Sequence, residues 1–299
     1  MIVITGATGH TGQPAAETLL AGGANVRVVS RDAKKLDQFV ALGAEAFVGN
    51  VEDRHAMAKA FEGADAVYLV MPEDASQPDL RAHQERISDS YAAAVAFARV
   101  PYVVALSSIG AQHAEGTGPI VGLHNMEQKL NQVPDLNVLY LRAGYFMENL
   151  LMSIAPMRSM GMLPGGMTSD LATPWIATKD IGKYAATRLM ARDFSSKSTQ
   201  ELHGQRDISM KEASSVIGKS IGKPNLGYMQ VPLLMLEPAL VQMGLPKSTA
   251  LLIEMWKGAN AGLITPLELR TAKNTTPTTL ESFAAEVFAP AFLSKTAGA

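Results

Sequence analysis

A glycine-rich turn at residues 5–12, with the sequence TGATGHTG, has the residue types and the spacing of a phosphate-binding loop. It follows a short apolar run and precedes an amphipathic stretch, so it joins a predicted strand to a predicted helix. In such a turn the first glycine permits a sharp exit from the strand, the second lets the backbone approach a pyrophosphate, and the third lets the helix pack closely. The N–H groups at the start of the helix favour an anion. We therefore predict a dinucleotide-binding loop; the alternative is a turn that binds no ligand. The predicted cofactor-binding residues of the loop are Gly6, Thr8, Gly9, His10, Thr11 and Gly12.

The charge at the end of the second predicted strand bears on which dinucleotide would bind. This strand ends with the sequence VVSR at 28–31, where a protein that prefers NAD usually carries an acidic residue for the ribose 2′-hydroxyl. The guanidinium of Arg31 can instead hold a 2′-phosphate, and Lys35 one helical turn later can add a second positive charge. We predict NADP(H) rather than NAD(H). The alternative is that Arg31 is an ordinary solvated residue.

Further cofactor contacts are expected where the later strands end, because ligands in this architecture lie across the carboxyl ends of the strands. After the third strand, an amide side chain can bind the adenine edge and an apolar side chain can pack on its face. The residues after the fourth strand should lie near the middle of the cofactor. Two serines at the end of the fifth strand should lie near the nicotinamide, although paired serines are also ordinary turn formers. In chain order the predicted contacts are Asn50, Val51, Met71, Pro72, Ser107 and Ser108.

These residues depend on strands and helices that bring them to one edge of a sheet. Short runs rich in Val, Ile and Ala alternate with amphipathic stretches through the first half of the chain. This alternation is typical of a parallel sheet covered by helices on both faces. We predict an α/β fold, a Rossmann-type doubly wound parallel sheet with a smaller C-terminal α+β substrate region. The expected strands are 2–5, 25–29, 44–48, 64–70, 102–106 and 137–141, and the expected helices are 11–21, 33–42, 54–61, 79–98 and 122–131.

The regular alternation ends after Arg142, and a segment rich in Met and Gly follows at 145–167. We therefore predict an NADP(H)-binding Rossmann domain at 1–149 and a smaller substrate-side region at 150–299, with crossovers of the chain back to the first domain allowed. The apolar stretch 228–256 contains three prolines, which favours short helices over one continuous helix. Its methionines suit an adaptable pocket, or else ordinary core packing or a subunit contact; they are Met229, Met235, Met243 and Met255.

Five segments together resemble the NmrA-like family of atypical short-chain dehydrogenases: 5–12, 30–31 (SR), 106–108 (LSS), 141–149 (LRAGYFMEN) and 276–283 (TPTTLESF). They are spread over essentially the whole chain, and 145–149 is more specific to the family than the glycine turn. The resemblance implies a Rossmann-type fold and NADP(H). The family includes quinone oxidoreductases, triphenylmethane reductases, isoflavone reductase-like enzymes and redox sensors. The resemblance therefore implies the cofactor more firmly than the reaction.

The usual catalytic pattern of this superfamily is absent. Classical members pair a Tyr with a Lys four residues later, so that the ammonium lowers the phenol pKa, whereas the residue four before Lys129 is Asn125. His124 and Glu127 are three residues apart and share a helix face, where the carboxylate can poise the imidazole near neutral pH. Tyr145, just after the sixth strand, is a further hydrogen-bond donor. We name His124, Glu127 and Tyr145 as catalytic candidates; the alternative is a solvent-facing helix with an incidental histidine.

The composition argues against several other classes of function. The 26 basic and 28 acidic residues give a net charge of -2, so no broad positive field would attract nucleic acid. The chain has no cysteine, and its six histidines lack the paired spacing of a structural metal site, so we expect no disulfide and no metal. The first residues contain neither a basic leader nor a long apolar stretch, which predicts a cytoplasmic protein without a membrane anchor.

We predict an NADPH-dependent reductase that transfers hydride to a small planar acceptor, such as a quinone, an enone or a related aromatic. Such an acceptor needs no strongly tuned acid, because simple hydrogen-bond donors or water can stabilise the developing oxyanion. The rival hypothesis is a non-catalytic NADP(H)-sensing regulator of the NmrA type, which the missing Tyr–Lys pair favours. A reductase of the isoflavone kind requires a lysine where His124 and Asn125 stand. A small-molecule substrate is the expected partner, and a homodimer stays open.

Overall fold

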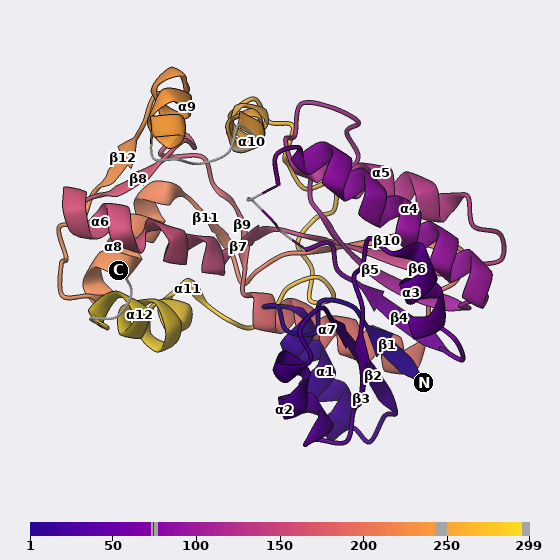
Figure 1. Ribbon diagram of the computed structural model, residues 1–299. Helices are drawn as coiled ribbons and strands as arrows, with labels where there is room; N and C mark the ends of the chain where they lie inside the picture. The colour runs from indigo at the N-terminus through magenta and orange to yellow at the C-terminus, as the bar shows by residue number, and fades with distance from the viewer. Residues whose placement is uncertain (73, 75–76, 243–249, 295–299) are drawn as a thin grey trace. The chain divides into compact units, whose positions relative to one another are not determined.

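The chain folds into two compact units (Figure 1). The structure, a computed structural model, describes residues 1–72, 74, 77–242 and 250–294. Unit 1 comprises Met1–Ala114, Pro119–Arg142 and Lys179–Gln200, and unit 2 comprises Glu115–Gly118, Ala143–Thr178 and the described part of Glu201–Ala299. The chain therefore leaves and re-enters unit 1 twice. The assignment of residues 1–149 to the cofactor and 150–299 to the substrate stays a prediction.

Unit 1 is built on a parallel sheet, which confirms the predicted Rossmann-type fold. In the described residues this sheet has seven strands in the order β10-β6-β5-β4-β1-β2-β3. The order reverses between β1 and β4, and this switch point lies directly beside the glycine turn that follows β1. β1 and β4 are buried along their whole length, as expected for central strands covered on both faces. The strands are β1 (Ile2–Ile4), β2 (Val26–Ser30), β3 (Glu45–Val48), β4 (Ala66–Leu69), β5 (Tyr102–Ser108), β6 (Asn137–Ala143) and β10 (Lys197–Leu202).

Helices cover both faces of this sheet. Figure 1 shows α3, α4 and α5 along one face and α1 and α7 along the other. The residue before the helix caps α3 and α4, since Asp53 accepts hydrogen bonds from two N–H groups at the start of α3 and Asp79 accepts one at the start of α4. The predicted helix 33–42 consists of a 3-10 turn and a single short helix. The helices are α1 (Gly12–Ala21), η1 (Lys34–Leu36), α2 (Asp37–Val40), α3 (Arg54–Ala60), α4 (Leu80–Ala98), α5 (Ile120–Asn131) and α7 (Thr178–Ala191).

Unit 2 is smaller in its sheets and richer in helices. In the part of the chain that the structure describes, it has a sheet of order β11-β9-β7 and a second sheet of β12 and β8. A hydrophobic core around the fully buried Trp175 joins these sheets to the helices. The elements are β7 (Tyr145–Phe146), η2 (Met147–Ser153), α6 (Ile154–Met160), β8 (Leu163–Gly165), β9 (Thr173–Ile176), β11 (Asp207–Ile208), α8 (Met210–Ser220), β12 (Tyr228–Gln230), α9 (Leu233–Gln242), α10 (Ala250–Asn260), α11 (Leu280–Phe283), η4 (Ala284–Phe288) and α12 (Ala289–Leu293).

A buried carboxylate at the end of β10 links this strand to residues 267–268. Glu201 accepts hydrogen bonds from the N–H groups of Leu267 and Glu268, at 2.9 to 3.0 Å, and from Nε2 of the buried His203 at 3.1 Å. Burial alone would raise the pKa of Glu201, but the hydrogen bonds from His203 and the two N–H groups outweigh it and lower the pKa. This carboxylate therefore stabilises unit 2 in its ionised form.

The proline-containing stretch 228–256 does not form one continuous helix, which agrees with the prediction. It forms β12, then α9 with Pro238 inside it, and α10. Pro246 and Met243 lie outside the described residues. Met229 and Met255 are half-buried and Met235 is 64% exposed, so a pocket lined by all of these methionines stays a prediction.

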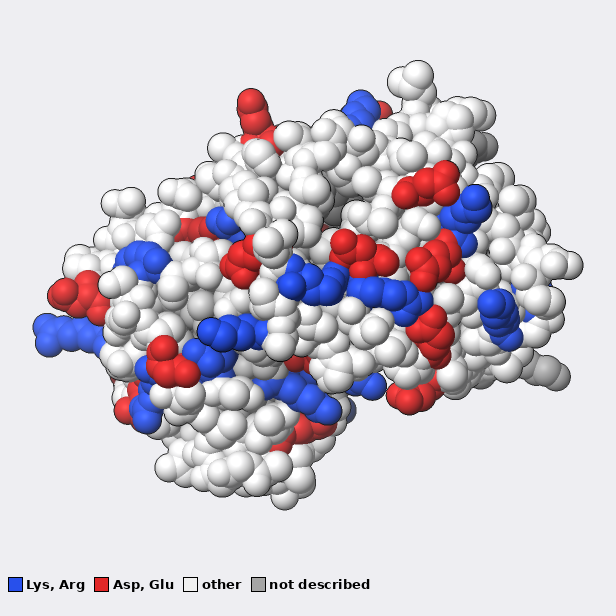
Figure 2. All heavy atoms as spheres, turned by 180° about the vertical axis from the view of Figure 1, so that it is seen from behind, with Lys and Arg blue, Asp and Glu red and all other residues white. Residues whose placement is uncertain are grey.

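The surface carries charges of both signs. In the view of Figure 2, acidic and basic side chains lie interspersed across the face shown. None of the helices that the structure describes is both long enough and apolar enough to cross a membrane.

Candidate functional site

The glycine turn packs so tightly against its own helix that two of its glycines have steric reasons to be there. Gly6 has a φ of 64°, in the left-handed region that favours glycine, and its carbonyl accepts a hydrogen bond of 2.9 Å from the N–H of Gly9. A Cβ added to Gly12, the first residue of α1, would lie 2.1 Å from that same carbonyl oxygen. The turn therefore lies directly against the start of the helix, as a dinucleotide-binding loop requires.

The N-terminus of α1 is suited to an anion. Thr11 is its N-cap residue, but the Thr11 side chain makes no capping hydrogen bond, and the first turn of the helix contains no acidic residue. Gly9 and His10 are exposed and Thr8 is half-buried, whereas Thr11 and Gly12 are buried. The positive end of the helix dipole thus has no anionic side chain of its own in its first turn. These residues fit the pyrophosphate of a dinucleotide.

A side-chain hydrogen-bond network fixes the turn to the neighbouring strand. Thr5 Oγ1 donates to the carbonyl of Tyr68 on β4 at 3.0 Å and accepts from the N–H of Val70 at 2.9 Å. Tyr91 on α4 in turn donates its hydroxyl to the carbonyl of Val70 at 2.8 Å. The switch point between β1 and β4 is therefore held rigidly on the side where the cofactor is expected.

The cations predicted to select NADP(H) follow β2 as expected. Arg31 and Lys35 are exposed, and Lys34 between them is a third exposed cation that the sequence analysis did not single out. The backbone here is set by a compact turn, in which Asp32 donates its N–H to Ser30 Oγ at 3.2 Å and accepts the N–H of Lys34 at 3.0 Å. This turn leads the chain into η1 and places three positive charges within five residues at the end of one strand.

The residues expected near the adenine, and those expected near the middle of the cofactor, are only partly accessible. Asn50 is exposed, and its Oδ1 accepts the N–H of Glu52 at 3.2 Å, which leaves the side-chain amide N–H groups for another partner. Val51 and Met71 are buried in the core of unit 1, and Pro72 is half-buried. Their contact with a cofactor stays a prediction.

Glu52 itself is part of an ion-pair cluster that sequence reasoning missed. Its carboxylate accepts from Arg86 Nε at 2.7 Å and lies 3.2 Å from Nδ1 of the buried His83. Burial opposes ionisation of Glu52, but the hydrogen bond from Arg86 and the charge of His83 outweigh it and lower the pKa. The cluster ties the loop after β3 to α4.

A buried triad lies between β5, α5 and β6. Ser107 Oγ donates to Glu127 Oε1 at 2.6 Å, and Arg142 donates to both oxygens of the same carboxylate at 3.0 and 2.6 Å. The Glu127 side chain is 3% exposed and that of Arg142 12%. Ser108 instead donates to the carbonyl of Ile109 at 2.9 Å. Glu127 is therefore fully engaged in joining the ends of two strands to the helix, which suits a positioning role better than proton transfer.

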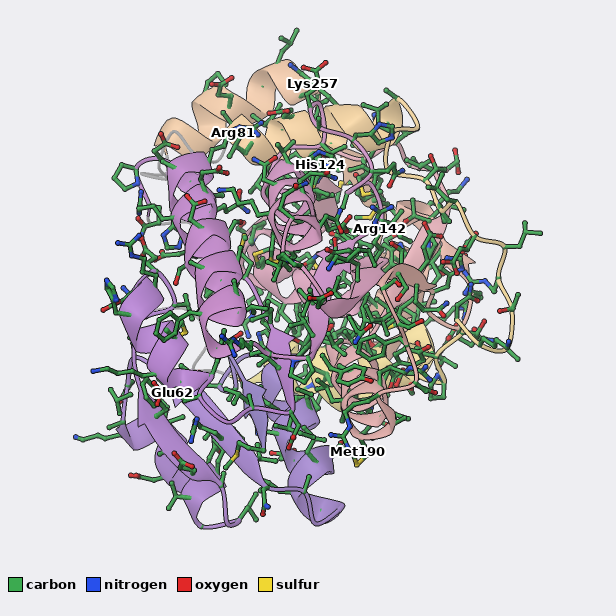
Figure 3. All side chains as sticks on the ribbon, turned by 90° about the vertical axis from the view of Figure 1, so that its right-hand side faces the viewer. Glu62, Arg81, His124, Arg142, Met190 and Lys257 are labelled. Carbon is green, nitrogen blue, oxygen red and sulfur yellow. The ribbon has the colours of Figure 1, made fainter. Side chains whose placement is uncertain are left out.

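His124 is held separately from this triad. Its Nδ1 lies 2.8 Å from the carbonyl oxygen of Ala111, which can only accept, so Nδ1 is the donor in this contact. Figure 3 labels His124 on α5 and Arg142 at the end of β6. His124 and Glu127 thus share a helix but bind different groups. Their joint catalytic role stays a prediction.

Tyr145 belongs to unit 2, whereas the other predicted site residues belong to unit 1. Its ring packs on Trp175 with centroids 4.7 Å apart and planes inclined by 44°. Burial raises the pKa of Tyr145 to about 12, against a hydrogen bond with Asn149 that lowers it. The nearby Glu148 accepts the N–H and the hydroxyl of Thr178, at 3.0 and 2.7 Å, and so caps the start of α7. The segment 145–149 thereby combines a phenol with a structural carboxylate.

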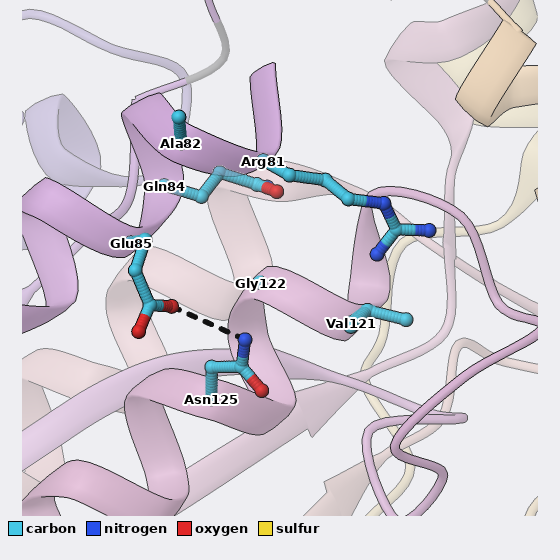
Figure 4. Close-up of a pocket in the computed structure, with 7 residues that line it drawn as sticks. All are labelled: Arg81, Ala82, Gln84, Glu85, Val121, Gly122 and Asn125. Atoms are coloured by element: carbon cyan, nitrogen blue, oxygen red, sulfur yellow. Dashed lines mark hydrogen bonds between the residues drawn. The ribbon is translucent and has the colours of Figure 1, made fainter. Parts of the chain in front are cut away.

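A pocket on unit 1 contains none of the predicted site residues. Figure 4 shows this pocket, about 230 Å³ in volume, between α4 and α5. Across it Asn125 Nδ2 donates to Glu85 at 3.2 Å, and Lys129 Nζ pairs with Glu85 and Asp89, each at 2.5 Å. The helix positions of the missing Tyr–Lys pair are therefore used to link two helices.

Comparison with known proteins identifies the family. The profile of the NmrA-like family matches residues 1–284. The chain belongs to the NmrA-like family. This NmrA-like chain is 25% identical over 254 residues to an NAD(P)H azoreductase of Xenophilus azovorans, covering 84% of each chain. It is 26% identical over 269 residues to quinone oxidoreductase 2 of Escherichia coli strain K12, covering 88% of this chain and 89% of the relative.

The fold of this NmrA-like chain also occurs in proteins of other activities. A crystal structure of a nucleoside-diphosphate-sugar epimerase from Staphylococcus aureus superposes with a TM-score of 0.81 at 18% identity, covering 95% of this chain and 99% of that one. Because one fold hosts several reactions, this likeness establishes the architecture alone.

Proposed function

We propose that the chain is an NADPH-dependent reductase that transfers hydride to a small planar acceptor such as a quinone, an enone or a related aromatic. The observation that carries the proposal is the glycine turn, in which Gly12 starts α1 against the carbonyl of Gly6 and no acidic side chain occupies the first helical turn. The names of the two curated relatives, an NAD(P)H azoreductase and a quinone oxidoreductase, support the reaction class. A small-molecule acceptor is the expected partner, and association into a homodimer stays a prediction.

The preference for NADPH rests on the cations after β2. Arg31, Lys34 and Lys35 are exposed and follow one another within a short turn. A guanidinium can bind a phosphate through two parallel hydrogen bonds, and each added positive charge strengthens the attraction. NADH lacks the 2′-phosphate and would gain nothing from these side chains.

The side chains of the protein would mainly orient the cofactor and the acceptor, and stabilise the charge that develops on the acceptor. When bound, NADPH supplies a hydride, which is two electrons and one proton, and a second proton from water or a hydroxyl completes the reduced acceptor. Tyr145, with a pKa of about 12, keeps its proton at neutral pH and can donate a hydrogen bond to a developing oxyanion. The triad of Ser107, Glu127 and Arg142 fixes the ends of β5 and β6. Catalysis would then depend on orientation more than on a tuned acid.

A second candidate function is a non-catalytic NADP(H) sensor of the NmrA type. The observation that favours it is the use of Lys129 and Asn125, the positions where a Tyr–Lys pair would stand, in contacts with Glu85 and Asp89. A sensor needs cofactor binding and a change of shape, and it needs no proton donor. Turnover therefore distinguishes the two functions.

The test combines binding with turnover. We expect Arg31→Ala to weaken NADPH binding at least about tenfold, the loss of one charge-assisted hydrogen bond of about 1.5–3 kcal/mol, and to leave NADH binding unchanged. Titration calorimetry measures both affinities, and Lys59→Ala, at an exposed lysine of α3, is the control. Absorbance of reduced nicotinamide then follows turnover with quinones, azo dyes and enones. An equal effect on both coenzymes, or none, contradicts the assignment of Arg31, and binding without turnover favours the sensor.

A further inference from the structure

Within unit 1, the helix α7 lies directly against α1. A Cβ added to Gly182 in α7 would lie 2.3 Å from the carbonyl oxygen of Thr11 and 3.0 Å from the backbone nitrogen of Ala15. Further along the two helices, a Cβ added to Gly22, the C-cap residue of α1, would lie 3.3 Å from Sδ of Met190 in α7. The two helices therefore run side by side in the same direction, on the same face of the sheet in Figure 1. At Gly182 the contact is between the backbones themselves.

The carbonyl that Gly182 meets belongs to the last part of the glycine turn. Thr11 is the N-cap residue of α1, and its carbonyl accepts a hydrogen bond of 3.3 Å from the N–H of Ala15. The same planar peptide unit carries the N–H of Gly12, the first residue of the helix. The first N–H groups of a helix have no partner within it and are the groups that bind an anion. A shift of the Thr11 carbonyl would therefore turn the Gly12 N–H away from a bound pyrophosphate.

The start of α7 is held in place by Glu148. Both oxygens of this carboxylate accept the N–H of Thr178, the first residue of α7, at 3.0 and 3.1 Å, and Oε1 also accepts its hydroxyl at 2.7 Å. Thr178 is buried, and Gly182 follows it by four residues, about one helical turn. A side chain at position 182 would therefore displace the peptide unit between Thr11 and Gly12 more readily than it would displace α7.

We propose that Gly182 and Glu148 are positioning residues for the pyrophosphate of NADP(H). Glu148 holds the start of α7, and Gly182 lets α7 set the orientation of the peptide unit whose N–H, on Gly12, would bind the pyrophosphate. Both residues act through α1. Their role differs from that of Arg31, which concerns the 2′-phosphate alone. The proposal deepens the proposed function, and it rests on the binding of the cofactor but not on turnover.

The variant Gly182→Ala is the first test. Because NADPH and NADH share the pyrophosphate, titration calorimetry should show both dissociation constants rising by the same factor, about tenfold or more, the value of one charge-assisted hydrogen bond. In the 31P spectrum of bound NADPH, the pyrophosphate signals should shift from their wild-type positions and the 2′-phosphate signal should not. The matched control is Gly218→Ala in α8, whose Cβ would lie 2.5 Å from the carbonyl oxygen of Lys223, within unit 2. It should lose stability and yet bind both coenzymes as the wild type does.

Variants of Glu148 test the anchor without a steric clash, and so they also serve if Gly182→Ala does not fold. Glu148→Ala should raise both dissociation constants about two- to tenfold, because α7 can then move away from Thr11. Glu148→Gln keeps an oxygen that accepts the N–H of Thr178 and should retain most of the affinity. The double variant of Gly182→Ala and Glu148→Ala should be less stable in urea than either single variant, and yet bind both coenzymes more tightly than Gly182→Ala. A general loss of structure would change stability and affinity in the same direction.

The outcomes separate this proposal from the proposed function. Unchanged dissociation constants in folded Gly182→Ala or in Glu148→Ala refute the positioning role, and so does a double variant that binds more weakly than Gly182→Ala. A loss of affinity for NADPH alone would assign the effect to the 2′-phosphate and would likewise refute it. A wild-type chain that binds neither coenzyme refutes the proposed function itself, whereas the expected constants without turnover refute the reductase alone.

Discussion

An alanine at position 9 separates the folding of the glycine turn from its capacity to bind a dinucleotide. Gly9 is exposed, and its φ lies outside the left-handed region, so alanine is allowed there. An added Cβ would meet only the carbonyl oxygen of Gly6 among the described atoms, at 3.3 Å. At Gly12 the same atom would lie 2.1 Å from that oxygen, which the backbone cannot accommodate without moving. Gly9→Ala is therefore the variant that leaves the fold intact.

The expected loss of NADPH affinity in Gly9→Ala follows from the hydrogen bond that the methyl group would displace. If a pyrophosphate approaches the backbone at Gly9, the methyl removes at least one charge-assisted hydrogen bond of about 1.5–3 kcal/mol. The NADPH dissociation constant should then rise roughly 10- to 150-fold. The free energy of unfolding should change by less than about 1 kcal/mol, because the neighbouring oxygen needs to move by only a few tenths of an ångström and alanine also restricts the unfolded chain.

Titration calorimetry with NADPH and urea unfolding of the same preparation measure the two effects independently. Gly227→Ala is the matched control, because its Cβ would meet only the flexible end of Met162 at 3.4 Å, in unit 2. An unchanged NADPH affinity in a correctly folded Gly9→Ala protein would refute the reasoning, because the methyl group would then not stand in the path of the phosphates.

Two further predictions concern buried charges. Glu127→Gln and Arg142→Met should each lower the free energy of unfolding by about 3–5 kcal/mol, because each leaves a buried partner uncompensated, and the double variant should lose less than the sum. Urea unfolding measures this against Glu62→Gln at the surface, and strict additivity would contradict the coupling. The lowered pKa of Glu201 means that its stabilisation is complete above the unfolded value near 4.5 and is lost as the pH falls through the folded value. Wild-type stability should therefore fall more steeply than that of Glu201→Gln between pH 6 and about pH 3, and parallel curves would exclude a role for this carboxylate.

Local patterns were sufficient to predict much of unit 1. The glycine turn is encoded within eight consecutive residues, and the six apolar strands differ clearly from the helices between them. β10 was missed because its sequence, KSTQEL, is polar and half exposed, so that its place in the sheet depends on pairing with β6 rather than on an apolar run. The helix at 33–42 was predicted too long, since the turn at Asp32 leads into a 3-10 segment that periodicity does not distinguish from an α-helix.

The contacts of the candidate site were harder to predict, because they join residues far apart in the chain. Spacing correctly placed His124 and Glu127 on one helix, but it could not reveal that Glu127 binds Ser107 and Arg142, which are 20 and 15 residues away. Arg142 stood within one of the segments that carry the family resemblance, 141–149, and a buried arginine at the end of an apolar strand is a signal that a carboxylate lies nearby. No local pattern connects Tyr145 with Trp175, whose rings meet only through the fold of unit 2.

The contacts made by α5 also restrict the acceptors that a reductase of this kind could use. Lys129 and Asn125 are bound to α4, and the Glu127 carboxylate is saturated by Ser107 and Arg142, so none of the three is poised to deliver a proton. Apart from His124, whose Nδ1 is bound to the carbonyl of Ala111, the remaining candidate donors are a phenol with a pKa of about 12 and water, which can stabilise an anion but transfer protons weakly. Hydride addition to a simple ketone produces a strongly basic alkoxide, whereas addition to a quinone produces a delocalised and far less basic oxyanion. The protein should therefore reduce quinones much faster than unconjugated ketones, and comparable rates with both would mean that an acid not present among these residues takes part.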